Sequence, residues 1–478
     1  MNVQRNFIGG AWVEGSGALR NVNPSDISDV VDEFSLATPA QVAEAIAAAR
    51  AALPVWGAMT LQARSEALDA VGTAILTRRE ALGRLLSREE GKPLPDGIGE
   101  VTRAGQLFKF YAGEVLRLAG ERLPSIRAGV EVEVMPEPVG VIGLITPWNY
   151  PSSVPANKIA PAIAYGNAVV LKPSELVPAS AVALFEIMEQ AGLPAGLVNL
   201  VIGGAEVGEA LATSPEINGI SFTGSTVTGR KVAAHAVANG ARVQLELGGK
   251  NPLVVLDDAP FDVAVECAVN GAFYQTGQRC TASSRLIVTE GVHDRFVEAV
   301  AERVRSLKVG HALEAGTQVG PVIDERQLAK DMSYVDIARG EGARLVAGGE
   351  RLNRDTEGFY LSPALFADTH RDMRINREEV FGPVASVIRV KDYEEAIEVA
   401  NDTTYGLSAG ICTTTMKYAH HFRRHVKAGM TMLNLPTAGV DYHVPFGGTK
   451  ASGYGPKEQG RVARDFFTQT KTSYLLEG

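Results

Sequence analysis

The stretch VGVIGLIT, residues 139–146, is the first indication of the fold of this 478-residue chain. It is almost continuously apolar, and similar short runs follow it, namely AVVLKPS, LVNLVIG, GISFTGS and VQLELGG. Strands without polar alternation are typically buried on both faces, as in a parallel sheet. The segments between them, such as residues 178–194, have the pattern of crossover helices. The series predicts a doubly wound α/β domain.

A second series of apolar runs begins near residue 251 and predicts a second doubly wound α/β domain. Its members are PLVVLDD, SRLIVTE, ASVIRVKD, LSAGICTT and GMTMLN. Ahead of the first series, the sequence favours helices after a short strand-like start. There, Thr38, Pro39 and Gln41 have the pattern of a helix N-terminus with a capping box.

Two further segments predict a small β ribbon. GVEVEVMPEP, residues 129–138, alternates apolar and polar side chains, and the tail KTSYLLEG, residues 471–478, has the composition of a short strand. We expect both to be edge strands, and an exposed edge invites pairing with another chain.

Composition narrows the class of protein. A hydrophobic fraction of 45% and a charged fraction of 21% are typical of a soluble globular protein. The net charge of −9, with basic residues spread throughout, argues against a nucleic-acid or anionic membrane partner. The sequence shows neither a signal-peptide pattern nor an apolar run near the ~20 residues of a membrane span. With three cysteines and no disulfide framework, it predicts a cytoplasmic protein.

The segment AFYQTGQRCTASSR, residues 272–285, places Cys280 among small and polar residues. Such a loop offers access and N–H donors, so we expect it to favour the reactive thiolate, whose pKa an apolar core would raise. Glu246 lies near the end of the apolar strand predicted in VQLELGG, residues 243–249, where a carboxylate is costly unless it is paired, protonated or used in catalysis. A thiol and a carboxylate in one cleft can form an acyl intermediate and activate the water that clears it. An isolated cysteine would more often be structural, but this pair favours catalysis.

Three loops follow predicted strands at the sheet edge where ligands bind. They are TPWNYP (146–151), LKPSE (171–175) and SFTGSTVTG (221–229). Lys172 and Glu175 could contact ribose hydroxyls, and Ser225 starts a helix whose N–H groups could hold a pyrophosphate. Each loop taken alone is also compatible with an ordinary turn or helix cap.

Together with Cys280, EEVFGPV (378–384) and PFGGTKASG (445–453), these segments resemble the aldehyde dehydrogenase superfamily along essentially the whole chain. The resemblance implies Cys280 as nucleophile, Glu246 as general base, and Asn149 as oxyanion donor beside the N–H of Cys280. It implies NAD as cofactor, with NADP as a possibility. The implied cofactor contacts are Thr146, Pro147, Trp148, Lys172, Glu175, Ser225, Glu379 and Phe381.

The resemblance also implies a division of the chain. Residues 1–119 and 139–248 would form the Rossmann-like NAD-binding domain, and residues 249–450 the catalytic domain. Residues 120–138 and 451–478 would form an oligomerisation arm and tail, which implies a homodimer or homotetramer.

Within the superfamily, NLPTAGVDYHVPFGG (434–448) resembles the 2-oxoglutarate semialdehyde (2,5-dioxopentanoate) dehydrogenases. That substrate is a small anionic aldehyde, so its carboxylate needs cations or several donors. The candidate substrate contacts are Arg279, Arg103, Gln106 and Tyr150. Asn157 departs from the Trp expected in this subfamily and from the Arg of succinate semialdehyde enzymes. Succinate semialdehyde, another aldehyde, or a binding protein without catalysis are the alternatives.

Two features favour ordinary structural roles. His421 and His425 have the i, i+4 spacing of metal ligands, but their basic neighbours and the lack of a third ligand favour a solvated helix, and we predict no metal site. Cys267 and Cys412 lie in apolar contexts and are predicted core residues.

Overall fold

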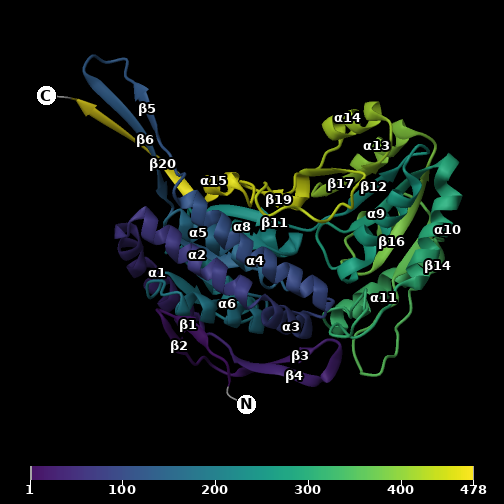
Figure 1. Ribbon diagram of the computed structural model, residues 1–478, viewed down its shortest axis with the longest axis horizontal. Helices are drawn as coiled ribbons and strands as arrows, with labels where there is room; N and C mark the ends of the chain where they lie inside the picture. Colours follow the sequence, from purple (N-terminus) through teal and green to yellow (C-terminus); the bar gives the residue numbers. More distant parts are fainter. Residues whose placement is uncertain (1–2, 477–478) are drawn as a thin grey trace.

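The computed structural model describes residues 3–476 and contains two large sheets, one in each half of the molecule (Figure 1). The first has eight strands in the order β19-β11-β10-β7-β8-β9-β1-β2. Strands β7 to β11 are the five predicted apolar runs, and all their mutual pairings are parallel. The strands are β1 (Asn6–Ile8), β2 (Ala11–Val13), β7 (Val141–Ile145), β8 (Ala168–Lys172), β9 (Val198–Leu200), β10 (Gly219–Thr223), β11 (Arg242–Glu246) and β19 (Gly453–Tyr454).

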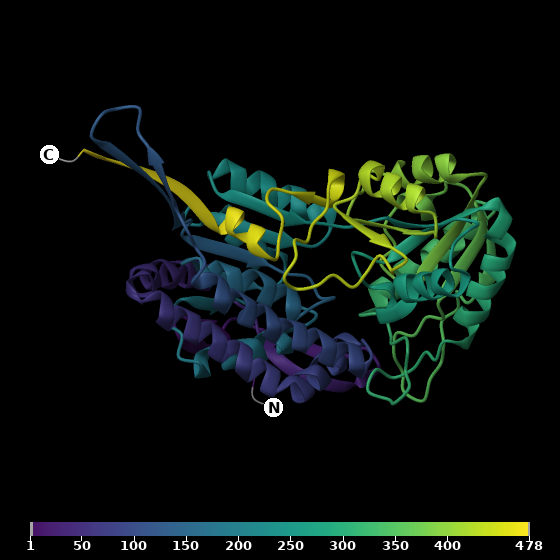
Figure 2. The ribbon, with the colours of Figure 1, turned by 45° about the horizontal axis from the view of Figure 1, so that its top comes forward.

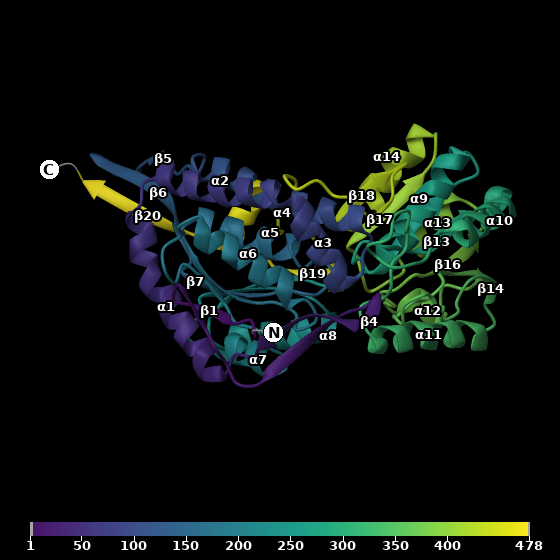
Figure 3. The same cartoon turned by 60° about the horizontal axis from the view of Figure 1, so that its bottom comes forward.

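Helices cover both faces of this sheet, as a doubly wound fold requires. Figure 3 shows α1, α7 and α8 on one side and α5 and α6 on the other. The helices of this half are α1 (Pro39–Ala58), α2 (Leu61–Thr77), α3 (Arg79–Glu90), α4 (Leu94–Val115), α5 (Ser153–Ala164), α6 (Pro178–Gln190), α7 (Ala205–Thr213) and α8 (Thr226–Ala238). The predicted capping box is confirmed at α1, where the Gln41 N–H donates to Thr38 Oγ1 over 3.2 Å and the Thr38 N–H donates to Gln41 Oε1 over 3.0 Å.

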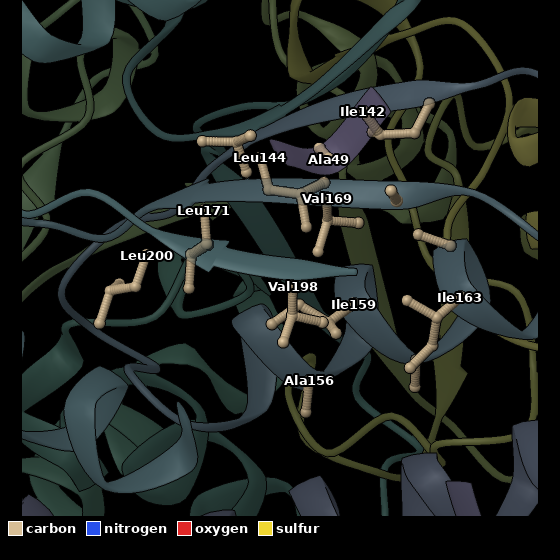
Figure 4. Packing of buried hydrophobic residues seen from close by; sticks show 14 of the residues in the cluster. Ala49, Ile142, Leu144, Ala156, Ile159, Ile163, Val169, Leu171, Val198 and Leu200 are labelled. Atoms are coloured by element: carbon tan, nitrogen blue, oxygen red, sulfur yellow. The ribbon is translucent and has the colours of Figure 1, made fainter. Parts of the chain in front are cut away.

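The core of the first half forms where the strands meet their helices. Ile142, Leu144 and Val169 of the central strands are fully buried, as are Ile159 and Ile163 of α5. Figure 4 shows these aliphatic side chains interdigitating. Burying such side chains contributes about 1.5–3 kcal/mol each, which fixes α5 and hence the loop between β7 and α5.

The second sheet has seven strands in the order β14-β15-β16-β13-β12-β17-β18. The five runs predicted here are all present, and β15 adds a parallel strand and β14 an antiparallel one. Its strands are β12 (Asn251–Val255), β13 (Ser283–Thr289), β14 (Arg344–Ala347), β15 (Ala364–Thr369), β16 (Val384–Val390), β17 (Ser408–Cys412) and β18 (Met430–Leu433). Its helices are α9 (Phe261–Phe273), α10 (Glu290–Ser306), α11 (Glu325–Gly340), α12 (Arg374–Arg377), α13 (Tyr393–Asn401) and α14 (Met416–His425). Cys267 and Cys412 are buried in this core, as predicted.

The third sheet forms an arm that projects from the body (Figure 2). It contains β5 (Glu121–Pro124), β6 (Val130–Pro138) and β20 (Thr468–Leu476) in the order β20-β6-β5. The prediction that residues 129–138 form an edge strand is wrong, because β6 pairs on both sides and its partner β20 comes from the tail. The last two residues of the predicted tail strand lie outside the described residues.

The chain reaches the arm by way of the first sheet. After residue 450, β19 pairs antiparallel with β11 before α15 (Arg464–Phe467) leads into β20. A separate hairpin joins β3 (Ala18–Asn23) and β4 (Asp26–Ser35). Within residues 3–476, no helix is both long and apolar enough to cross a membrane.

Candidate active site

A cavity of about 330 Å³ is lined by residues from both α/β halves. The loop after β7, the end of β11 and the start of α8 contribute from the first half. Cys280, α11 and the Glu379 loop contribute from the second. Helices α4 and α5 and residues 439–459 also line the cavity. Predicted site residues that line the cavity are Arg103, Pro147, Trp148, Asn149, Tyr150, Ser225, Glu246, Cys280, Glu379 and Phe381. Tertiary structure thus brings together residues that are far apart in sequence.

Cys280 follows a tight turn in which Gln275 and Thr276 both adopt positive φ angles, 54° and 58°. Burial raises the pKa of the Cys280 thiol to about 12, and the charges of Glu379 and Glu246 act in the same direction. The N–H groups of Cys280 and Thr281 oppose this shift only partly. This shift is opposite to the expectation that the polar loop favours the thiolate, although Cys280 keeps the intermediate solvent exposure that access requires. A thiol with such a pKa would react as a nucleophile only after losing its proton.

Glu246 is buried at the end of β11. Burial raises its pKa well above the usual range, and the charge of Glu458 adds to this effect, whereas Lys457 and Lys158 oppose it. The Gly448 N–H donates to Oε2 of Glu246 over 3.4 Å. A Cβ at Gly447 would collide with Oε1 of Glu246, so PFGGTKASG packs directly against this carboxyl group. A carboxyl group with a raised pKa suits general acid–base work near neutral pH.

A buried polar network lies in the wall near Glu246, and the sequence analysis missed it. Lys158 contacts Glu458 and donates to Ser221 Oγ over 2.7 Å. Asn157, at the predicted mouth position, donates to Glu458 Oε2 over 2.8 Å. Glu458 and Asn157 line the cavity. The signal in the sequence was a lysine on the otherwise apolar face of α5, which indicates a buried partner.

The loop after β7 is tied to the cysteine segment by two side chains. Asn149 Nδ2 donates to the Gln278 carbonyl over 2.9 Å, and the Tyr150 hydroxyl donates to Gln275 Oε1 over 2.6 Å. Asn149 is buried and lines the cavity. Its amide is therefore held in a fixed orientation beside the chain that carries Cys280.

Glu379 lies against the glycine pair after β11. The Gly249 N–H donates to Glu379 Oε1 over 2.7 Å, and a Cβ at Gly248 would collide with the same carboxylate. Phe381 has a positive φ of 68°, and its ring meets that of Trp148 edge-on at 5.4 Å.

Gln327 and Lys330 of α11 also line the cavity, and the sequence analysis missed both. Gln327 Nε2 donates to the carbonyl oxygens of Val380 and Phe381 over 3.1 and 3.2 Å. These bonds tie α11 to the Glu379 loop, a long-range contact that no local pattern indicates.

The predicted ribose and phosphate contacts lie around β8 and α8. Lys172 Nζ donates to the carbonyls of Pro173 and Gly203 over 2.8 and 2.7 Å and lies 3.6 Å from Glu175. Lys172, Glu175 and Thr146 do not line the 330 Å³ cavity, whereas Ser225 does and caps α8.

The hydroxyl oxygens of Thr223 and Thr226 flank the Ser225 cap. Both are buried and accept or donate no hydrogen bond of good geometry in the described part of the chain, although the Tyr405 hydroxyl lies near that of Thr226. Orphaned buried hydroxyls need an explanation such as an ordered water or a ligand. Ser225 and these two hydroxyls therefore fit a polar ligand at the N-terminus of α8.

Two predicted substrate contacts are corrected by the structure. Arg279 does not line the cavity, because its buried guanidinium turns toward α9 and donates to the carbonyls of Asn270 and Gly271. Cys280 lines the cavity, whereas the side chain of Arg279 is hydrogen-bonded to carbonyl groups of α9. Gln106 is also absent from the lining, although Arg103, one turn earlier on α4, is part of it.

His421 and His425 stack with their ring centroids 3.9 Å apart. Their Nδ1 atoms bond to the Tyr393 hydroxyl and the His421 carbonyl. In the part of the chain that the structure describes, no group of three or more His, Cys, Asp or Glu residues could hold a metal ion.

Comparison with known proteins agrees with this geometry. The chain is 40% identical to the alpha-ketoglutaric semialdehyde dehydrogenase of Bacillus subtilis (strain 168), over 99% of this chain and 98% of the relative. It is also 40% identical to the 2,5-dioxopentanoate dehydrogenase of Saccharolobus solfataricus, over 97% of each chain. The crystal structure of betaine aldehyde dehydrogenase from Staphylococcus aureus in complex with NAD+ superposes with a TM-score of 0.96 and 36% identity, covering 99% of this chain and 95% of that one. The model of the Aldehyde dehydrogenase family matches residues 12–473, and the chain belongs to this family.

Proposed function

We propose that this protein oxidises an aldehyde to a carboxylic acid with NAD, or with NADP as an alternative, through a thiohemiacetal and a thioester on Cys280. The observation that carries this proposal is the meeting of Cys280, Asn149 and Glu246 in one cavity. A thiol nucleophile, an amide donor and a carboxyl group with a raised pKa are the parts that acyl transfer to water requires.

The proposed reaction has two stages, formation of a thioester on Cys280 and its hydrolysis. Cys280 Sγ loses its proton to a water molecule and adds to the aldehyde carbon, while the Asn149 amide and the Cys280 N–H donate to the oxygen that gains charge. When bound, NAD supplies the hydride acceptor. Loss of hydride from the carbon leaves a thioester on Sγ. Glu246 then takes a proton from water, the resulting hydroxide attacks the thioester, and the C–S bond breaks to release the acid and the cysteine.

The proposed cofactor site runs from β8 to the Glu379 loop. Glu379, fixed by the Gly249 N–H, would hold the ribose next to the nicotinamide. The rings of Trp148 and Phe381, which line the cavity, would lie beside it. Ser225 and the orphaned hydroxyls beside it would meet the pyrophosphate. Lys172 and Glu175, outside the cavity, would contact the adenosine ribose.

The proposed substrate is 2-oxoglutarate semialdehyde. Relatives at 40% identity carry that activity in their names. Arg103 supports the same substrate, because it lines the cavity and donates only to neutral acceptors, the Val440 carbonyl and Gln459 Oε1. Among residues 3–476 it makes no ion pair within 4.0 Å. A cation in the cavity lining that makes no ion pair can bind the carboxylate of an anionic substrate.

The test is NAD(P)H formation over a panel of 2-oxoglutarate semialdehyde, succinate semialdehyde and propanal. We expect the highest kcat/KM with the first, and Cys280→Ala should abolish turnover while NAD still quenches tryptophan fluorescence. A Cys280→Ala variant that turns over within tenfold of the wild type would contradict the nucleophile. A wild type that prefers propanal would contradict only the substrate.

The proposed assembly is a homodimer or homotetramer formed through the arm. Among residues 3–476, β20 pairs with β6 alone, and its exposed side chains include Tyr474, Leu475 and Leu476. An exposed apolar edge strand is a site for pairing with another chain. Light scattering at micromolar concentration should give a multiple of the 50.7 kDa chain mass, and a monomer would contradict the proposal.

A further inference from the structure

Lys92 is buried between α3 and α4. Burial of a charged side chain is costly, so its presence here needs an explanation. Its side chain is 2% exposed, and its Nζ lies 2.6 Å from Glu100 and 3.9 Å from Glu90. Burial alone would lower the pKa of Lys92, but the charges of Glu100 and Glu90 raise it above the ordinary value. Lys92 is therefore a charged group that the fold has removed from water. Such pairs seldom stabilise a protein more than apolar side chains of the same volume would.

The ammonium group of Lys92 also reaches the loop that carries the oxyanion donor. Nζ donates to the backbone carbonyl of Asn149 over 2.7 Å and lies 4.1 Å from the centroid of the Tyr150 ring. An ammonium group has three N–H donors. Two of them are used on Glu100 and Asn149, and the charge faces an aromatic ring.

Glu100 holds the other end of the same loop. Its Oε1 accepts the N–H groups of Ser152 and Ser153 over 2.9 and 3.0 Å, while its Oε2 accepts from Lys92. The ion pair thus grips the chain on both sides of Pro151, at the Asn149 carbonyl and at the first amides of α5. These bonds are charge-assisted and therefore stronger than bonds between neutral groups.

We propose that Lys92 is a positioning residue for the proposed reaction, which acts with Glu100 to hold the Asn149 backbone so that its amide meets the developing oxyanion. The inference rests on the proposed function. The simpler alternative is that the ion pair only joins α3, α4 and α5. The two differ in kinetics, because a small displacement of a catalytic group lowers the rate of the chemical step even in a folded enzyme.

The test is a double-mutant cycle on the rate of NADH formation in a single turnover, with enzyme in excess over propanal. Propanal carries no carboxylate, so the proposed contact with Arg103 does not affect the measured rate. Lys92→Met should lower the rate about 10- to 100-fold. In an Asn149→Ala background the same substitution should change it by no more than about threefold, since Lys92 acts through Asn149. The NAD dissociation constant should stay within about twofold of the wild type in every variant.

A matched control comes from Glu89, a buried carboxyl group on α3. Glu89 accepts the N–H groups of Ala179 and Ser180 and does not touch the loop of Asn149. Glu89→Gln should leave the single-turnover rate within about twofold of the wild type even if Tm falls. If Lys92→Met does not fold, Lys92→Gln replaces it in the cycle, and because its amide can still donate to the carbonyl, a rate between those of wild type and Asn149→Ala is expected.

The inference is overturned if the Lys92 variant reacts as fast as the wild type. It is equally overturned if the losses from Lys92 and Asn149 multiply, because Lys92 would then act independently of Asn149. A wild-type enzyme that forms no NADH from any aldehyde would instead remove the proposed function itself.

Discussion

The side-chain amide of Asn149 donates a hydrogen bond to the backbone carbonyl of Gln278 over 2.9 Å. This bond joins the loop after β7 to the segment that carries Cys280, two residues later. A primary amide has two N–H groups. One is committed to Gln278 and fixes the plane of the amide, and the other is left for an oxygen atom in the cavity. The proposed nucleophile and the proposed oxyanion donor belong to different halves of the molecule, and this contact links the two segments that carry them.

The reactivity of Cys280 should depend steeply on pH. Because burial raises the pKa of the thiol to about 12, the thiolate fraction should grow about tenfold per pH unit between pH 7 and 9. The measurement is the rate of iodoacetamide labelling without nucleotide, followed by mass spectrometry. Cys280→Ala serves as the control, since Cys267 and Cys412 are buried and should label slowly. A rate that levels off below pH 8 would mean that the thiol is already ionised there.

Replacing Glu246 by Gln should separate the two halves of the reaction. The thioester should still form, but its hydrolysis should slow by about 10²–10⁴-fold, as expected for loss of a general base. Rapid-quench kinetics should show a burst of NADH followed by very slow turnover. In the wild type, steady-state turnover should rise with pH as Glu246 loses its proton, because burial raises its pKa. Loss of the burst itself would show that Glu246 also deprotonates Cys280.

Arg103→Met should discriminate between charged and neutral substrates. Loss of a charge-assisted bond costs about 1.5–3 kcal/mol, or a factor of roughly 10 to 150 in kcat/KM. The semialdehyde should lose that factor, and propanal should be nearly unaffected. Lys109→Met is the control on the same helix, because Lys109 pairs with Asp69 outside the cavity lining. An equal loss with both substrates would mean that Arg103 shapes the cavity without binding the carboxylate.

Glu175 should favour NAD over NADP. Its side chain is 41% exposed, and its pairing with Lys172 at 3.6 Å offsets only part of its charge, so it would repel a 2′-phosphate. Glu175→Gln should raise the ratio of kcat/KM for NADP to that for NAD about fivefold or more. Glu44→Gln, an exposed acid on α1, controls for net charge. A ratio unchanged by Glu175→Gln would place the adenosine ribose elsewhere.

The apolar runs of the sequence were sufficient to predict ten strands of the two large sheets and to point to the residues proposed for catalysis. Continuous apolar runs can be buried on both faces only in a covered parallel sheet, so VGVIGLIT and its successors predicted the doubly wound fold without any tertiary information. Cys280 and Glu246 were found because each breaks a local rule: a thiol in a polar loop, and a carboxylate at the end of an apolar strand.

The orientation of the side chains and their exposure to solvent became known only from the tertiary structure. Arg279 and Arg103 look equally suitable in sequence, but Arg279 turns onto the carbonyls of α9 while Arg103 reaches the cavity. The contact of Lys92 with the Asn149 carbonyl spans 57 residues, and the high pKa of Cys280 arises from groups on other elements. Periodicity and propensity report on neighbours along the chain. Burial and charge depend on what packs against a residue from elsewhere, and that is fixed only when the chain has folded.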